Sequence, residues 1–105
     1  MNTKVLIAED DVLIAETLKS YLIEFGYSVS EVVSSLEEFK QEIEQDVDFC
    51  FLDIRMHGKD LGFELAEYLN EHSSIPFMFL TSFSDVETIQ EKIKKLKESA
   101  FKKED

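Results

Sequence analysis

The chain has 105 residues, which is enough for one domain with a modest hydrophobic core. Its 11 basic and 23 acidic residues give a formal net charge of −12, and this excess of acid argues against binding to nucleic acid or to an anionic membrane surface. The single cysteine, Cys50, leaves no intrachain disulfide, and the apolar run of four residues near the N-terminus is too short for a signal peptide or a membrane span. We therefore expect one cytoplasmic domain over residues 1–105.

The first third of the chain passes from a strand pattern to a helix pattern and back. Residues 5–8 are continuously apolar, which is typical of a strand buried on both faces of a parallel sheet. Apolar residues then recur at helical spacing over residues 14–25. Asp11 is placed to cap the start of this helix, and Gly26 is placed to cap its end. Residues 27–33 mix apolar with polar side chains, which predicts an edge strand.

A second helix and a second buried strand follow. Residues 36–43 carry a helical stripe, and Ser35 with Glu38 three positions later forms a capping-box pattern at its start. Residues 49–52 are again continuously apolar and predict a strand that is buried on both faces.

The last part of the chain continues the alternation. A helical stripe over residues 65–69 precedes an apolar strand over residues 75–80, and a further helical stripe covers residues 86–96. Strict alternation with short loops predicts an α/β domain, a doubly wound parallel sheet with helices on both faces.

Acids and hydroxyls follow three of the apolar runs. Glu9 and Asp10 come directly after the first run, Asp53 ends the third, and Thr81 with Ser82 ends the fourth. Because ligands of open α/β sheets bind beyond the carboxyl ends of the strands, these side chains are candidates for one site. Capping is the alternative role for each of them taken singly, and it stays open for the two hydroxyls.

Three carboxylates at neighbouring strand ends would repel one another near neutral pH, so that at least one pKa should rise in the absence of a cation. A divalent cation removes the conflict, and an all-oxygen ligand set suits Mg²⁺, with Mn²⁺ as the alternative. The two histidines, His57 and His72, stand alone and are expected to be exposed without a role. A carboxylate held beside Mg²⁺ can attack phosphorus in line, which makes Asp53 a candidate nucleophile beside Glu9 and Asp10 as metal-holding groups.

Three segments, taken as a set, resemble the receiver domains of two-component response regulators. They are VLIAEDDVLI with its acidic pair, FCFLDIRMHG with Asp53, and FMFLTSFSD with Thr81 and Ser82. The resemblance runs in register over roughly residues 4–97 and implies a flavodoxin-like receiver fold with strand order 2-1-3-4-5.

The resemblance also implies roles for particular residues. Asp53 would accept a phosphoryl group from a sensor histidine kinase or phosphotransfer protein. Mg²⁺ would be held by Asp10, Asp53 and the backbone carbonyl of Arg55, while Glu9 would act through a metal-bound water. Thr81, beside Ser82, would contact a phosphoryl oxygen and shift on phosphorylation.

The resemblance further implies a phosphoacceptor domain that assists its own phosphorylation and dephosphorylation and is not otherwise an enzyme. Phosphorylation would alter the surface offered to a downstream protein partner.

The chain departs from the family pattern in three places. His57 stands where proline is usual, and the loop over residues 58–62 is one residue longer than the commonest form; little effect on chemistry is expected from either. At the C-terminal end, Phe101 is the candidate switch aromatic, with Lys103 and then Lys102 as the candidate phosphate-pairing lysine. An internal deletion of the fifth strand is the alternative interpretation.

Both interpretations predict an atypical or truncated fifth βα unit, and a C-terminal end that is incomplete. Apolar surface beside the fourth strand would then be bare. A homodimer, a swapped element or a chain cut from a longer parent would each resolve this.

Three other functions compete with phosphoacceptance. A degenerate receiver would act as a phosphorylation-independent binding or dimerisation module. A phosphatase of the haloacid-dehalogenase type would need an aspartate two positions after its nucleophile, where Arg55 stands. A flavodoxin-like electron carrier would need a loop that binds phosphate, but Glu9 and its acidic neighbours would repel FMN.

Overall fold

The computed structural model of the protein describes residues 3–80 and contains four strands and three helices in this range. In chain order they are β1 (Lys4–Ala8), α1 (Val12–Glu24), β2 (Ser28–Val33), α2 (Leu36–Ile43), β3 (Phe49–Asp53), α3 (Leu61–His72) and β4 (Phe77–Leu80). Every predicted strand and helix up to residue 80 is therefore confirmed in type and order. The predicted helix over residues 86–96 and the fifth βα unit lie outside the described residues.

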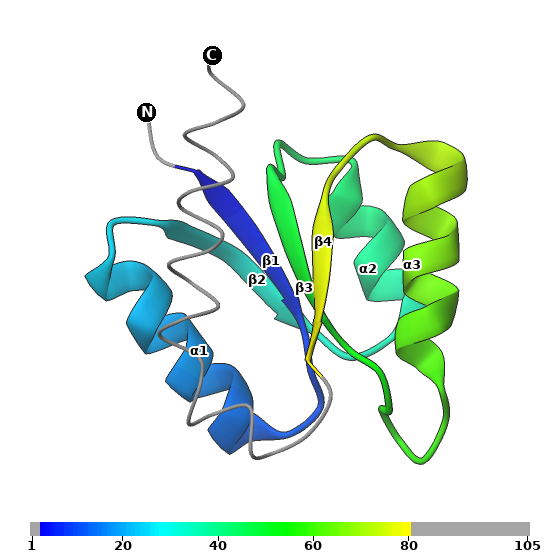
Figure 1. Cartoon of the computed structure of the whole chain (residues 1–105), viewed down its shortest axis with the longest axis horizontal. Helices are drawn as coiled ribbons and strands as arrows, with labels where there is room; N and C mark the ends of the chain where they lie inside the picture. The colour runs from blue at the N-terminus through cyan, green and yellow to red at the C-terminus, as the bar shows by residue number, and fades with distance from the viewer. Residues whose placement is uncertain (1–2, 81–105) are drawn as a thin grey trace.

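The four strands form one parallel sheet in the order β2-β1-β3-β4. This agrees with the first four positions of the predicted order, and β2 is an edge strand, as its mixed composition predicted. Figure 1 shows α1 on one face of the sheet and α2 with α3 on the other. The fold is thus the predicted doubly wound α/β sheet, with helices on both faces. Within residues 3–80, no helix is long and apolar enough to cross a membrane.

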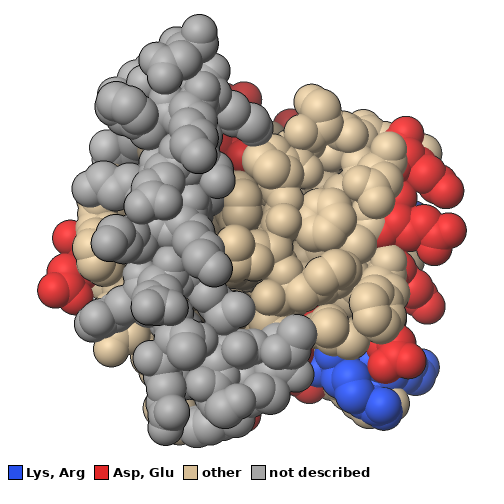
Figure 2. Space-filling view, viewed as in Figure 1, with Lys and Arg blue, Asp and Glu red and all other residues tan. Residues whose placement is uncertain are grey.

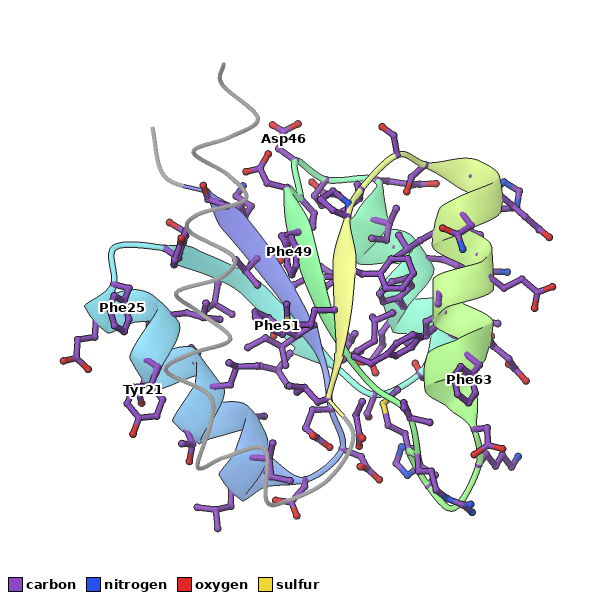
Figure 3. All side chains as sticks on the ribbon, viewed as in Figure 1. Tyr21, Phe25, Asp46, Phe49, Phe51 and Phe63 are labelled. Carbon is purple, nitrogen blue, oxygen red and sulfur yellow. The ribbon has the colours of Figure 1, made fainter. Side chains whose placement is uncertain are left out.

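The two central strands are buried on both faces because their side chains alternate between two separate cores. In β1, Val5 and Ile7 pack into the core beneath α1, whereas Leu6 packs into the core beneath α2 and α3. Phe49 and Phe51 of β3 likewise face α1, and their rings meet edge to face with centroids 5.4 Å apart; Figure 3 shows both beside β3. Continuous apolar runs are required wherever both sheet faces are covered in this way.

The helix ends follow the predicted capping chemistry. The carboxylate of Asp11 accepts hydrogen bonds from the backbone N–H groups of Leu13 (2.9 Å) and Ile14 (3.2 Å), and these close the first turn of α1. Gly26 follows α1 with a φ of +91°, a left-handed conformation that glycine adopts without a steric penalty. These caps fix where α1 begins and ends relative to the sheet.

The start of α2 differs in one detail from the predicted capping box. The Ser35 hydroxyl accepts from the N–H of Glu38 at 3.2 Å, as expected. The Glu38 carboxylate, however, accepts from the N–H of Ser34 at 3.3 Å, the residue before the cap. This ties the end of β2 to the first turn of α2.

Candidate metal and phosphorylation site

Three carboxylates meet at the carboxyl edge of the sheet. Glu9 and Asp10 follow β1 directly, and Asp53 is the last residue of β3, which pairs with β1. One oxygen from each carboxylate lies within 4.8 Å of an oxygen from each of the others. Neighbouring parallel strands thus deliver side chains that are distant in the sequence to one place, and these three oxygens could hold a divalent cation.

Glu9 is the buried member of this cluster. Its residue is 4% exposed, and it is the one charged residue that is fully buried between residues 3 and 80. Burial, a hydrogen bond to Asp53 and the negative charges of Asp53 and Asp10 raise the pKa of Glu9 to about 8, although the N–H of Asp11 opposes this shift. Without a cation, Glu9 therefore keeps its proton near neutral pH and shares it with Asp53.

Asp53 is partly buried, and its pKa is raised for related reasons. Burial is the largest cause and the charge of Asp10 adds to it, while hydrogen bonds from Glu9 and from the N–H groups of Arg55 and Ile54 pull the pKa down. The expected rise in a carboxyl pKa is thus found, chiefly at Glu9. The cluster runs from the buried Glu9 through the partly buried Asp53 to the exposed Asp10, and oxygens that retain a proton for lack of positive charge fit Mg²⁺, which would supply that charge.

The stability of the metal-free protein should fall as the pH rises from about 5 to about 8. Glu9 has a folded pKa of about 8 against an ordinary value of 4.5. The folded state therefore binds more protons than the unfolded state in this range, and the free energy of unfolding must decrease with pH. Urea unfolding in EDTA should show this slope for the wild type. A Glu9→Gln variant, which cannot titrate, should show a clearly smaller slope and be more stable by a few kcal/mol at about pH 8.5; equal slopes would contradict the burial of a proton at Glu9.

The loop between β3 and α3 frames the site. Met56 and Lys59 exchange two backbone hydrogen bonds of 2.9 and 3.0 Å around a two-residue turn, and the Arg55 guanidinium donates to the carbonyl of Gly58 at 2.9 Å. In Figure 2 the Lys and Arg atoms that are visible gather at one corner, where Figure 1 shows this loop, while acidic atoms line the side of α3. The assignment of the Arg55 carbonyl as a metal ligand stays a prediction.

His57 contacts the site, which sequence reasoning missed. Its backbone N–H donates to Oδ2 of Asp10 at 2.8 Å, and its ring Nε2 lies 3.1 Å from the carbonyl oxygen of Ser34. The available signal was the replacement of the family's usual proline, because proline has no N–H to donate. Both histidine side chains are exposed, as predicted, His57 to 60% and His72 to 57%; His72 lies at the end of α3, beside Glu71 and Tyr68.

The remaining predicted site residues, Thr81, Ser82, Phe101, Lys102 and Lys103, lie outside the described residues. Their roles in phosphate binding and switching therefore stay predictions.

A doubly wound parallel sheet with an acidic cluster at its carboxyl edge is the arrangement expected of a phosphoacceptor signalling domain. Residues 5–104 match the family described as the response regulator receiver domain. The chain belongs to that family.

Similar proteins agree with this assignment. The aerobic respiration control protein ArcA of Escherichia coli K12 is 36% identical over 77 residues, which are 73% of this chain and 32% of that protein. The transcriptional regulatory protein ZraR of the same strain is 31% identical over 93 residues, 89% of this chain and 21% of ZraR. The crystal structure of the receiver domain of the response regulator TorR superposes with a TM-score of 0.67 at 31% identity, covering 79% of this chain and 68% of that one. The chain thus spans about a third or less of these curated relatives.

Proposed function

We propose that this receiver domain is a phosphorelay switch that accepts a phosphoryl group on Asp53 with the help of Mg²⁺. The donor would be the phosphohistidine of a sensor histidine kinase or phosphotransfer protein. The observation that carries the proposal is the meeting of Glu9, Asp10 and Asp53 within 4.8 Å at the carboxyl edge of the sheet. Carboxylates this close together in a partly buried place repel one another, and a bound cation or a proton removes the repulsion.

Each carboxylate has a separate task in this proposal. Asp53, held at the end of β3, would present its oxygen to phosphorus. Asp10 and Asp53, with the Arg55 carbonyl, would hold the ion directly, and Glu9 would hold it through water. Mg²⁺, when bound, neutralises charge on the phosphoryl oxygens. With the ion bound, Glu9 would be ionised, its proton having passed to solvent.

The transfer itself needs little from the protein beyond position. A carboxylate oxygen of Asp53 forms a bond to phosphorus while the bond from phosphorus to the donor nitrogen breaks, and the leaving imidazole takes the electron pair and later a proton. Hydrolysis reverses the modification when a water oxygen attacks phosphorus and the Asp53 carboxylate leaves. Thr81, Ser82 and a lysine, Lys103 or Lys102, would contact the phosphoryl oxygens, and Phe101 would respond to them.

The signal would then pass by protein contact to a downstream partner, in the cytoplasm, and a homodimer is one form that this contact could take. Residues 1–105 would form the single domain that makes these contacts.

Intact-protein mass spectrometry with acetyl phosphate tests the proposal. With Mg²⁺ present, we expect the protein to gain the mass of one phosphoryl group, and to lose it again after the donor is removed. The gain should vanish in EDTA and return with Mn²⁺. A protein that stays unmodified while it binds divalent cations would instead be the degenerate receiver, a binding module that works without phosphorylation.

A further inference from the structure

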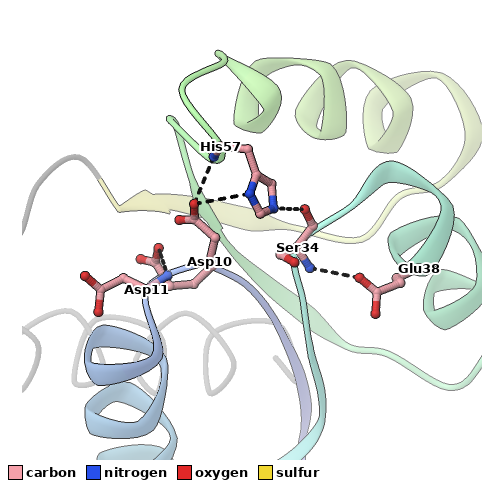
Figure 4. A network of polar contacts seen from close by, with 6 residues as sticks. Asp10, Asp11, Ser34, Glu38 and His57 are labelled. Atoms are coloured by element: carbon pink, nitrogen blue, oxygen red, sulfur yellow. Dashed lines mark hydrogen bonds and ion pairs between the residues drawn. The ribbon is translucent and has the colours of Figure 1, made fainter.

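His57 connects three parts of the site that are far apart in the sequence. Its backbone N–H reaches the Asp10 carboxylate after β1, at a separation of 47 residues, and its ring reaches the Ser34 carbonyl after β2, at a separation of 23. His57 itself stands in the loop after β3. Figure 4 shows its ring lying between the Asp10 carboxylate and the Ser34 carbonyl, with Glu38 of α2 beyond Ser34.

The backbone at His57 is in the left-handed region, which residues other than glycine seldom adopt. Its φ is +54°, and the following Gly58 has a φ of +73°. Two positive φ values in a two-residue hairpin are typical of a type I′ turn, for which Asn-Gly is the preferred pair. The turn alone therefore does not call for an imidazole. The ring must be explained by what it contacts.

The two contacts of His57 do different things. A carbonyl oxygen only accepts, so Nε2 must donate to Ser34 and the ring is anchored on the end of β2. The other ring nitrogen, Nδ1, is 3.8 Å from Oδ2 of Asp10, which is too long for a hydrogen bond. The backbone N–H at 2.8 Å is thus what holds Asp10, and within residues 3–80 it is the one hydrogen bond to that carboxylate.

We propose that His57 is a positioning residue for the metal site: its ring anchors the loop on the Ser34 carbonyl, so that its backbone N–H holds the Asp10 carboxylate beside Glu9 and Asp53. The inference rests on the proposed function of the acidic cluster. A carboxylate held by an N–H meets the ion already oriented, whereas a free one must be ordered when the ion binds. Groups that orient metal ligands in this way typically change metal affinity 10- to 100-fold when they are lost.

A His57→Asn variant isolates the ring. Asparagine tolerates a positive φ and keeps the backbone N–H, but its short amide does not replace the imidazole at Ser34. We expect Mn²⁺, measured by electron paramagnetic resonance, to bind about tenfold more weakly. In the NMR spectrum without metal, the amide proton of residue 57 should move upfield and exchange faster with water, because its hydrogen bond to Asp10 is less well held. A His72→Asn variant removes the other histidine and should match the wild type in both measurements.

The outcomes separate this inference from the proposed function. If the wild type binds no divalent cation, the metal site fails and the role of His57 fails with it. If the wild type binds Mn²⁺ and H57N binds it equally well with an unchanged amide signal, only the role of His57 is overturned. Should H57N not fold, His57→Gln decides in the same assays, because its longer amide can donate to Ser34. An affinity for Mn²⁺ between that of the wild type and that of an Asp10→Asn variant supports the anchor. An affinity as low as that of D10N overturns it.

Discussion

An Asp53→Asn variant will take up no phosphoryl group from acetyl phosphate under conditions in which the wild type is modified. The amide has no carboxylate oxygen to form the bond to phosphorus, and the neighbouring carboxylates do not end a strand as Asp53 does at the end of β3. The measurement is the mass of the intact protein with Mg²⁺ present. A mass gain in D53N equal to that of the wild type would place the acceptor elsewhere and overturn the assignment.

The same variant should be more stable than the wild type when no metal is present. Replacing Asp53 by an amide removes one of the negative charges that raise the pKa of Glu9, so this pKa should fall. Less stability is then lost as the pH rises toward about 8. Urea unfolding in EDTA should therefore give D53N a larger free energy of unfolding than the wild type at alkaline pH. Asp46→Asn is the matched control. Asp46 is exposed near the opposite end of β3, as Figure 3 shows, and its replacement should change neither phosphorylation nor this pH dependence.

A Gly62→Ala variant will be destabilised by about 3 kcal/mol or more. Gly62 lies in the first turn of α3, and its N–H donates to the carbonyl of Ile54 at 2.9 Å. A methyl group at Gly62 would lie 2.2 Å from the carbonyl oxygen of Asp53 and 2.6 Å from the Cα atom of Ile54. Both are backbone atoms, so the helix and the end of β3 must separate. In a helix, alanine is ordinarily more stable than glycine by about 1 kcal/mol. The loss of stability expected for G62A is therefore opposite in sign to the helix preference.

Urea unfolding measures the stability of G62A, and Mn²⁺ binding measures whether the displaced end of β3 disturbs the metal site. Gly26→Ala provides the comparison, because a Cβ there meets nothing within 4 Å while the φ of +91° remains unfavourable. G26A should lose about 1–2 kcal/mol through backbone strain and keep the affinity of the wild type for Mn²⁺. A G62A protein as stable as the wild type would show that α3 does not need this close approach to β3.

Those parts of the fold that depend on local pattern could be predicted from the sequence. Continuous apolar runs predicted the strands because burial on two faces demands them, and Asp11 and Gly26 predicted the ends of α1 through capping chemistry. The meeting of Glu9 and Asp53 also followed from topology, since parallel strands end at a common edge. The repulsion among the carboxylates could therefore be predicted from the sequence.

The rest could not be predicted because it depends on distances across the fold. That Glu9 is the carboxyl group that keeps a proton follows from its burial, which the run of three acids does not reveal. The contact between His57 and Asp10 depends on the shape of one hairpin, and the closeness of Gly62 to Asp53 depends on how α3 leaves that loop. Periodicity carries no information about such contacts.

The burial of β1 and β3 on both faces divides the edge of the sheet into a fixed half and a variable half. Glu9 and Asp53 stand at the ends of the two strands that have neighbours on every side, so their spacing is set by the interior of the protein. The groups around them come from loops, and His57, which holds the Asp10 carboxylate from the loop after β3, is one of these. A framework of this kind keeps the acceptor and its buried neighbour in place, while a substitution in the surrounding loops would tune how tightly the ion is held without rebuilding the core.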